Sequence, residues 1–523
     1  MFESTGVTAN DLKSVGRKVV RRAGKQILLI ASGGGTFAIA NRCPHEGYPL
    51  SEGTEGPDCV LTCNWHNWKF DLKTGAALVG RDPVRTYAVD LRDGEIFLDL
   101  TDPPTDALRE RALNGLDAAL ADNDRPRMAR EVARLEASGF DAGTALVHAL
   151  HSRGTHLEYG MTHAHAAAAD WIALAERAPT EEARFAAMLE PLGHLAWDTL
   201  GAPEYPYADG VAIWNEAEFL KAIEEEDEPA ALARVRGALW ESIPYMQLRP
   251  ALAASALSHY ADFGHSAIYV LKAGHLIGHL GTEAMEPVLF ALVRQQINAT
   301  REERLPEFRG YSKAMAAWDG SGSEPAKASD FIGLSSDGAL KRTLSSSGRP
   351  VRELYDALLG AAAFNLLHFD LAYDKATANP LADNVSWLDF THALTFANAA
   401  RHLCADRPEL WPQALLQMAL FVGRNRGYVD AKQDASRWRV NDIVGFIETE
   451  MSTLYDHAIV EPIIACHRVK MLFALEDELA VASTAPWMPD MASAMNRWLR
   501  TPQKRHHGLR IATQARDFVA REG

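Results

Sequence analysis

The spacing of hydrophobic and polar positions divides the chain into two parts. Up to about residue 100, short apolar runs at 26–30, 36–40 and 95–98 are separated by residues that favour turns. Gly33-Gly34-Gly35 and Asp93-Gly94 can supply the positive φ angles of hairpin turns. Because the glycine run leads into a second strand and not into a helix, a dinucleotide-binding loop is excluded. This part is predicted to be all-β.

Beyond residue 106 the pattern changes to alanine-rich segments with apolar residues three and four positions apart. This spacing, typical of helices, is clear from 144 onward and at 284–296 and 354–367. Pro103 and Pro104 mark the change, because paired prolines end strands and stiffen a connection. We therefore predict a β domain over 1–101, a linker over 102–106 and a large all-α, histidine-rich domain over 107–523.

One stretch interrupts the helical pattern. Residues 319–350 are rich in glycine, serine and proline, which predicts a long loop. A loop of this length in a compact domain is either disordered or a functional lid, and the sequence does not distinguish the two.

The composition narrows the classes of function. The chain has 523 residues, with 53 Lys and Arg against 69 Asp and Glu, for a net charge of -16. Nucleic acid and anionic membranes select basic surfaces, so neither is an expected partner. No run of about 18 apolar residues predicts a membrane span, and residues 1–6 lack the features of a secretory signal. Five cysteines are too few for a disulfide scaffold, so we expect a cytoplasmic protein.

Two short motifs in the β domain bring metal-ligand chemistry. Cys43-Pro44-His45 and Cys63-Asn64-Trp65-His66 together offer two thiolates and two imidazoles. A Rieske [2Fe-2S] cluster needs that set, with two Cys on one iron and two His on the other. A Cys2His2 zinc site is the alternative, but its usual pattern pairs Cys with Cys and His with His. Here each loop offers one of each.

The residues around these motifs resemble the Rieske [2Fe-2S] ferredoxin family over about residues 5–100. The matching text is CPHEGYPL at 43–50, CNWHNWKFD at 63–71, and Thr74-Gly75. The resemblance implies that Cys43 and Cys63 bind the inner iron, and that His45 and His66 bind the outer iron near the surface. Cytochrome-type members carry an extra, disulfide-bonded Cys in each loop. Here those places hold Tyr48 and Trp65, which indicates the ferredoxin and oxygenase branch. Cys59 is interpreted as a packing residue on the incoming strand.

A Rieske cluster only moves electrons, so a chain of this size is expected to contain an acceptor. Rieske ring-hydroxylating oxygenases bind a mononuclear iron through Asp-x2-His-x4-5-His in a mixed α/β domain. Asp389 and His392 match the first half of that motif, but no His follows at the required distance. The protein is therefore not predicted to be a conventional ring hydroxylase.

The helical part instead carries 17 of the 19 histidines in a repeated pattern. Asp-Phe-x-His occurs at 262–265 and 389–392, and each copy is followed ten residues later by His-Leu. His457 and His467 show the same spacing of ten, and 161–164 is a looser copy. The pattern indicates a duplicated helical unit. It predicts a cavity with six catalytic candidates, which are Asp262, His265, His275, Asp389, His392 and His402.

Three roles for these histidines remain open. They could bind a second metal, in which case the candidate ligands are His163, His265, His275, His279, His392 and His402. They could contact a polar substrate. They could also simply pack, with hydrogen bonds to the backbone or to the Asp three residues earlier. His275 and His279, four apart on a helix, have the geometry of a helical chelate.

Two histidine-centred phrases, SWLDFTHALTFA at 386–397 and GTHLEYG at 154–160, resemble the questin oxidase-like family. That resemblance implies a helical, histidine-rich protein that oxidises polycyclic aromatic polyketides. Fusion to a Rieske domain departs from the usual family member. It puts in doubt any reaction driven directly by a nicotinamide cofactor.

The sequence therefore predicts an oxidoreductase, a monooxygenase that acts on an apolar small molecule. No nucleotide-binding motif is present, so electrons are expected from NAD(P)H through a separate reductase or a ferredoxin. The helical domain would hold the acceptor, such as a second iron centre. By analogy with Rieske oxygenases a homo-oligomer is expected. The alternative is a non-enzymatic electron-transfer or redox-sensing protein whose helical domain binds a ligand or partner.

Overall fold

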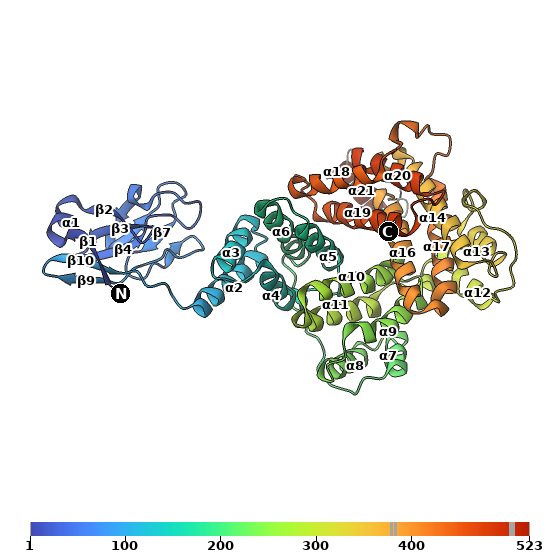
Figure 1. The fold of residues 1–523 in the computed structure, drawn as a ribbon, viewed down its shortest axis with the longest axis horizontal. Coiled ribbons are helices and arrows are strands. Elements are labelled where there is room, and N and C mark those ends of the chain that lie inside the picture. The colour runs from blue at the N-terminus through green and yellow to red at the C-terminus, as the bar shows by residue number, and fades with distance from the viewer. Residues whose placement is uncertain (1, 377–379, 381–383, 502–507, 522–523) are drawn as a thin grey trace. The chain divides into compact units, whose positions relative to one another are not determined.

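The computed structural model describes residues 2–376, 380, 384–501 and 508–521. The chain forms two compact units, residues 1–111 and 112–523, which we describe separately. Figure 1 shows that the strands lie in the first unit and that helices make up the second. The predicted fold class, a β-rich N-terminal domain followed by a large helical region, is confirmed.

The first unit contains three antiparallel sheets and one short helix, α1 (Ala9–Val15). The first sheet has the order β1 (Phe2–Thr8), β10 (Glu95–Asp99), β9 (Val89–Arg92). The second has the order β2 (Arg17–Arg22), β3 (Lys25–Ser32), β4 (Gly35–Ala40). The third has the order β5 (Thr54–Gly56), β6 (Val60–Thr62), β7 (Lys69–Asp71), β8 (Ala77–Val79). The predicted hairpin turns are present, with φ of 54° at Gly33 and 80° at Gly34.

Strand β3 is buried on both faces and joins the two cores of this unit. Ile27 and Leu29 point into the core that the first sheet covers. Leu28 and Ile30 alternate with them and point into a second core, which contains Cys43 and Cys63. The two predicted cluster cysteines therefore lie at the edge of an apolar core.

Helices α2–α21 follow the sheets, and the second unit begins within α2. Their bounds are α2 (Thr105–Ala121), α3 (Arg125–Ala137), α4 (Ala142–Gly154), α5 (His163–Glu176), α6 (Glu181–Asp198), α7 (Glu216–Glu224), α8 (Glu228–Trp240), α9 (Tyr245–Ser258), α10 (His265–Leu280), α11 (Met285–Asn298), α12 (Gly310–Ala316), α13 (Ser336–Leu344), α14 (Val351–Leu367), α15 (Leu371–Lys375), α16 (Trp387–Asp406), α17 (Trp411–Asn425), α18 (Ile443–Thr453), α19 (Pro462–Ala482), α20 (Met488–Arg500) and α21 (Gly508–Ala520). The three helices expected from periodicity are confirmed as α4, α11 and α14. Among the described residues, none of these helices is long and apolar enough to cross a membrane.

The expectation of one uninterrupted loop over 319–350 is wrong, although residues 319–327 have no helix or strand. The segment contains helix α13, which packs against α17, and a 3-10 turn at Ala328–Asp330. Ser335 caps α13 by accepting the Gly338 N–H, so the serine that looked like loop composition is a helix start. Arg342 donates hydrogen bonds to Ser346 and to Asp330, which ties the rest of the segment to the helix.

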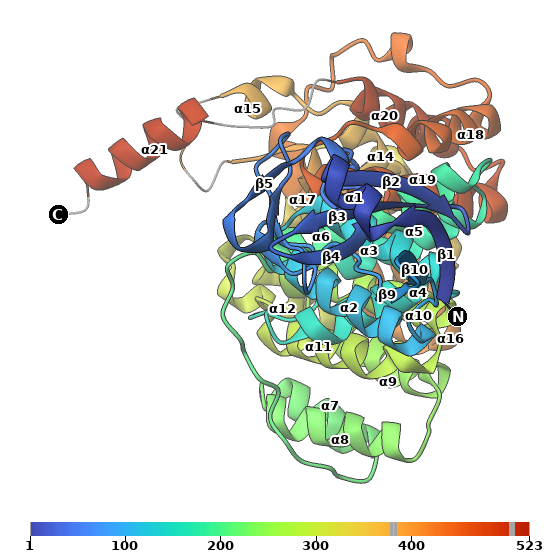
Figure 2. The same cartoon turned by 90° about the vertical axis from the view of Figure 1, so that its left-hand side faces the viewer.

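Four helices at the centre of this unit close into a ring. Helix α5 packs against α10 and α19, and α16 packs against the same two helices. Helices α7 and α8 lie side by side at the edge of the unit (Figure 2). The ring positions the site described below.

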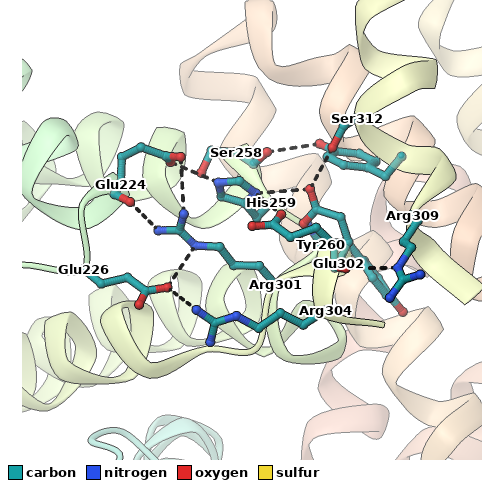
Figure 3. Close-up of polar contacts among 12 residues, drawn as sticks. Glu224, Glu226, Ser258, His259, Tyr260, Arg301, Glu302, Arg304, Arg309 and Ser312 are labelled. Carbon is teal, nitrogen blue, oxygen red and sulfur yellow. Dashed lines mark hydrogen bonds and ion pairs between the residues drawn. The ribbon is translucent and has the colours of Figure 1, made fainter. Parts of the chain in front are cut away.

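A charged network fixes the end of α9 to the α7–α8 turn (Figure 3). His259 Nδ1 lies 3.1 Å from Glu302 Oε1, and its Nε2 lies 3.0 Å from Glu224 Oε2. Only the imidazolium, with a proton on each ring nitrogen, can donate to both carboxylates at once. The Glu302 hydrogen bond and the Glu224 hydrogen bond raise the pKa of His259 against the effect of burial. Glu303 lies 4.0 Å from His259 Nδ1, and Arg301 forms an ion pair with Glu224.

We predict that this network stabilises the fold at mildly acid pH. A raised pKa contributes stability that is complete below the pKa of the unfolded chain and is lost as pH rises through the folded value. His259→Gln should therefore cost about 1–3 kcal/mol in urea unfolding at mildly acid pH, and less at alkaline pH. Arg304→Gln, at an exposed position of the same network, is the control and should cost less than about 0.5 kcal/mol. An equal cost for His259→Gln at both pH values would contradict the assignment.

Candidate electron-transfer and metal sites

The two Cys-His loops of the first unit have the same backbone structure. In the first, the Cys43 N–H donates to the Tyr48 carbonyl, and the Gly47 N–H donates back to Cys43. In the second, the Cys63 N–H donates to the Trp68 carbonyl, and the Asn67 N–H donates back to Cys63. Gly47 and Asn67, each four residues after its cysteine, have φ of 76° and 59°. The left-handed residue turns each loop back so that its Cys and His face the other loop.

The four predicted ligands lie together at the tips of these loops. Cys43 and Cys63 are 4% and 1% exposed, and burial, with the neighbouring Cys63 thiol, raises the pKa of Cys43 to about 11. Adjacent buried thiols resist ionisation unless a cation stabilises the thiolates. On the solvent side, the Nδ1 atoms of His45 and His66 lie 3.1 Å apart. Two buried sulfurs and two outer imidazole nitrogens are the donor set of a Rieske [2Fe-2S] cluster.

Aromatic rings hold the two histidines in place. Trp68 stacks on His45 with ring centroids 4.7 Å apart and an interplanar angle of 14°, and Trp65 stacks on His66 at 5.2 Å and 18°. Gly80 makes room for Trp68, because a Cβ there would lie 2.3 Å from the indole. Trp65 is 55% exposed, so the histidine side of the site faces solvent, where electrons can enter and leave.

The remaining predictions for this region concern cysteine pairing. All five cysteines of the chain are free. Cys59 is buried, as expected for packing, but it lies in a 3-10 turn, Pro57–Cys59, and not on the strand. Its sulfur fills the space beside Gly33, where a Cβ would approach within 2.7 Å.

A second group of metal-ligating side chains lies inside the helical unit, one from each helix of the ring. His163 and His265 begin α5 and α10, and His392 and His467 lie in the second turns of α16 and α19. The Nε2 atom of His163 lies 3.2 Å from that of His265 and 3.4 Å from that of His392. The Nε2 atoms of His392 and His467 are 3.2 Å apart. We call these four residues the histidine cluster.

Backbone carbonyls orient three of the four imidazoles. His392 Nδ1 donates to the Leu388 carbonyl at 2.6 Å, and His467 Nδ1 donates to the Ile463 carbonyl at 2.7 Å. His265 Nδ1 donates in the same way to the Asp262 carbonyl. An imidazole that donates through Nδ1 has its lone pair on Nε2 when it is neutral. The three lone pairs therefore point at one another.

Burial disfavours a positive charge on the histidine cluster. It lowers the pKa values of His163, His392 and His467 well below the ordinary value, and it also lowers that of His265. Lys470, one turn beyond His467, is fully buried, and its amine has no hydrogen-bond partner among the described residues. Converging lone pairs repel one another unless a cation or a proton lies between them. The donor chemistry therefore fits a metal ion, and three of the cluster, His163, His392 and His467, have donor atoms within 4.8 Å of one another.

The structure divides the predicted site residues into two groups. His163, His265 and His392 are in the cluster, whereas His275, His279 and His402 line a cavity of about 470 Å³ farther along the ring. In that cavity His402 Nε2 lies 2.6 Å from Asp477, and His279 Nδ1 lies 3.0 Å from Glu176. A spacing of ten residues is nearly three helical turns, about 15 Å, so the members of a pair cannot share one metal.

The two aspartates of the repeated motif have different surroundings. The Asp262 carboxylate lies 3.8 Å from His265 Nδ1, beside the cluster. Asp389 instead closes a capping box by accepting the Ser386 N–H, and it forms an ion pair with Arg424 at 2.9 Å. Its place three residues before His392 reflects the helix start.

Sequence reasoning missed His467 as a member of the cluster. The spacing of ten makes His457 the first member of its pair and His467 the second. His457, however, lies outside the four ring helices and faces Glu190. The correct alignment starts each unit at the cluster histidine, which puts Asp477 where the other two units have His275 and His402. The repeat pattern therefore includes His467, but as the first position of its unit and not as the second.

The comparisons with known proteins concern the first unit. The family model of the Rieske [2Fe-2S] domain matches residues 6–88. The 3-phenylpropionate/cinnamic acid dioxygenase ferredoxin subunit of Escherichia coli (strain K12) is 42% identical over 76 residues, which are 14% of this chain and 72% of that protein. Through its N-terminal unit the chain therefore belongs to the Rieske [2Fe-2S] family.

Two further matches are a larger oxygenase component and a solved ferredoxin structure. The carbazole 1,9a-dioxygenase terminal oxygenase component CarAa of Sphingomonas sp is 32% identical over 145 residues, 25% of this chain and 38% of CarAa. The chain thus matches little more than a third of that oxygenase. The solved ferredoxin of carbazole 1,9a-dioxygenase from Nocardioides aromaticivorans IC177 is 26% identical, with a TM-score of 0.18 and coverage of 19% of this chain and 99% of that one.

We predict that Cys43→Ser abolishes the visible and paramagnetic spectrum of the Rieske cluster, because a thiolate on the inner iron is lost. Cys59→Ser is the matched control, since this cysteine is equally buried but only packs. It should keep the spectrum. A cluster that survives Cys43→Ser, or is lost equally in Cys59→Ser, would contradict the ligand assignment.

Proposed function

We propose that the protein is an oxidoreductase of the oxygenase type. In this proposal the Rieske cluster receives electrons that originate in NAD(P)H, through a separate reductase or ferredoxin, and passes them to a metal ion held by the histidine cluster. The substrate is an apolar small molecule oxidised with O2, as in a monooxygenase.

The observation that carries the proposal is the convergence of four Nε2 atoms from four helices. Packing alone does not require neutral imidazoles to direct their lone pairs at one point, and burying them without a partner is costly. His163, His265, His392 and His467 would hold the ion. When bound, an iron ion there supplies redox chemistry with O2, which a Rieske cluster does not perform on organic substrates.

The donor set favours a single ion. Di-iron sites in helical bundles depend on several glutamates that bridge or neutralise two metal ions. The converging side chains here are all imidazoles, and the nearest motif carboxylate, Asp262, faces the Nδ1 side of His265. His163 Nδ1 is within 3.5 Å of the Tyr269 hydroxyl, which helps to orient the fourth imidazole of the cluster.

The substrate class is supported from two sides. The relatives of the Rieske unit are described as components of carbazole and of 3-phenylpropionate/cinnamic acid dioxygenases, whose named substrates are aromatic. The histidine-centred phrases resemble questin oxidase-like proteins, which implies a polycyclic aromatic or polyketide-like substrate. The Escherichia coli relative is described as the ferredoxin subunit of a dioxygenase, which supports electron transfer between protein partners. A homo-oligomer is proposed by analogy with Rieske oxygenases.

Iron analysis tests the proposal. The anaerobically purified protein should contain about three irons per chain, two in the cluster and one on the histidines. His392→Ala should lower the value to about two while the Rieske spectrum stays unchanged, because its Nε2 contacts two of the other ligands. His402→Ala, on the same helix but in the other cavity, is the control and should keep three.

A different iron content would distinguish the proposed oxygenase from a non-enzymatic redox protein. About two irons in the wild-type protein, with no other metal present, would contradict the metal site. That result would favour a redox protein whose helical unit only binds a ligand or a partner.

A further inference from the structure

The ring of helices has a second polar layer beyond the histidine cluster. Because each helix starts near the cluster, the positions ten residues after the four histidines fall at one level. These positions are Ala173, His275, His402 and Asp477, and all four line the cavity of about 470 Å³. The cavity therefore opens inside the ring, about three helical turns from the cluster.

The floor of this cavity is a buried ion pair. Asp170 and Lys272 both line it, although only 3% of the first and 7% of the second is exposed. Lys272 Nζ donates to Asp170 Oδ1 at 2.6 Å. The other carboxylate oxygen, Asp170 Oδ2, is buried and has no hydrogen-bond partner among the described residues. A buried carboxylate oxygen without a partner, on a residue that lines a cavity, indicates an internal water or a ligand beside that oxygen.

The ion pair lies on the way from the cavity to the cluster. Asp170 is two turns beyond His163 on α5, and Lys272 is two turns beyond His265 on α10. Both stand between the level of the cluster and the level of His275. Lys470 interacts electrostatically with Asp170 and Lys272 on one side and with His163 and His467 on the other. Buried polar side chains thus continue through the ring from the cavity to the cluster.

The proposed chemistry needs such a continuation. Insertion of one oxygen atom consumes O2, two electrons and two protons, and converts a C–H bond into C–OH with release of water. Without an organic substrate, the same electrons and protons reduce O2 to H2O2. A Rieske cluster carries only electrons, one at a time. Protons must therefore reach the buried histidine cluster separately, from water.

We propose that Asp170, paired with Lys272, is the proton entry to the histidine cluster from the cavity. This inference rests on the proposed function. Water in the cavity protonates the Asp170 carboxylate and is replenished from solvent, and Asp170 then releases the proton inward through the buried polar groups. Asp170 is a positioning and relay residue, since it does not touch the cluster.

Several charged groups surround this carboxylate. Lys272 faces it from α10 and Lys470 from α19. The walls of the cavity add His275, His279, His402, Arg177, Glu476 and Asp477.

The test follows O2 reduction by protein that has been reduced anaerobically with a stoichiometric amount of dithionite. Reoxidation of the Rieske absorbance and the yield of H2O2 are recorded after mixing with O2 at several pH values. Asp170→Asn should slow reoxidation by about 100-fold. Acetate, which can enter the cavity and donate a proton, should restore part of the rate. Asp170→Glu should retain most of the rate because it keeps a carboxylic acid.

Glu476→Gln is the matched control, because this residue lines the same cavity but pairs with Arg177 near the surface. It should react like wild type. If Asp170→Asn does not fold, the double variant Asp170→Asn/Lys272→Gln, which removes both charges of the pair, replaces it. Reoxidation at the wild-type rate, or slow reoxidation that neither acetate nor Asp170→Glu restores, would overturn the relay.

Failure of the relay can be distinguished from failure of the proposed function. Iron content and the Rieske spectrum are measured on each variant before the reaction. Wild-type protein that lacks a helical iron, or that reoxidises no faster than His392→Ala, contradicts the metal site itself. A metal-loaded wild type that reoxidises rapidly leaves the relay as the only hypothesis under test.

Discussion

Hydrogen bonds from three imidazoles to the carbonyls of Asp262, Leu388 and Ile463 determine what the helical unit can bind. Each bond fixes one imidazole nitrogen as the donor. It leaves the other nitrogen with a lone pair directed at the centre of the ring of four helices. Without them the histidines could rotate or change tautomer, and their Nε2 atoms would not converge. The carbonyls belong to helix starts, so the orientation of the ligands is built into the backbone.

The rest of the helical unit supports this arrangement. Gly264 has φ of 77°, and a Cβ there would lie 2.6 Å from Phe396, so a larger residue would displace the start of α10 and His265 with it. Four helices that begin near one point also place the positive ends of their dipoles there. Neutral imidazoles suit such a position better than imidazolium ions would. A bound cation would therefore gain its stability mainly from the four nitrogen donors.

The Rieske ligands could be predicted from the sequence because each loop holds its Cys and His within four residues. Local spacing therefore reveals them, and the flanking residues carry a family resemblance. The histidine cluster takes one residue from each of four helices spread over about 300 positions, so its geometry is set by tertiary packing. The repeated Asp-Phe-x-His motif pointed to the correct helices, but it could not show that Asp389 caps a helix while Asp262 lies beside a ligand. The residues that the spacing of ten connects lie in two separate layers of the ring.

The central claim is that one chain contains both an electron-transfer cluster and a separate redox-active metal. The most direct test is an anaerobic reductive titration that counts electrons against bleaching of the Rieske absorbance. A Rieske cluster accepts one electron, so wild-type protein in its oxidised state should take up about two electrons per chain and His392→Ala about one. Uptake of about one electron by both proteins, with all of it accounted for by the cluster, would contradict the account.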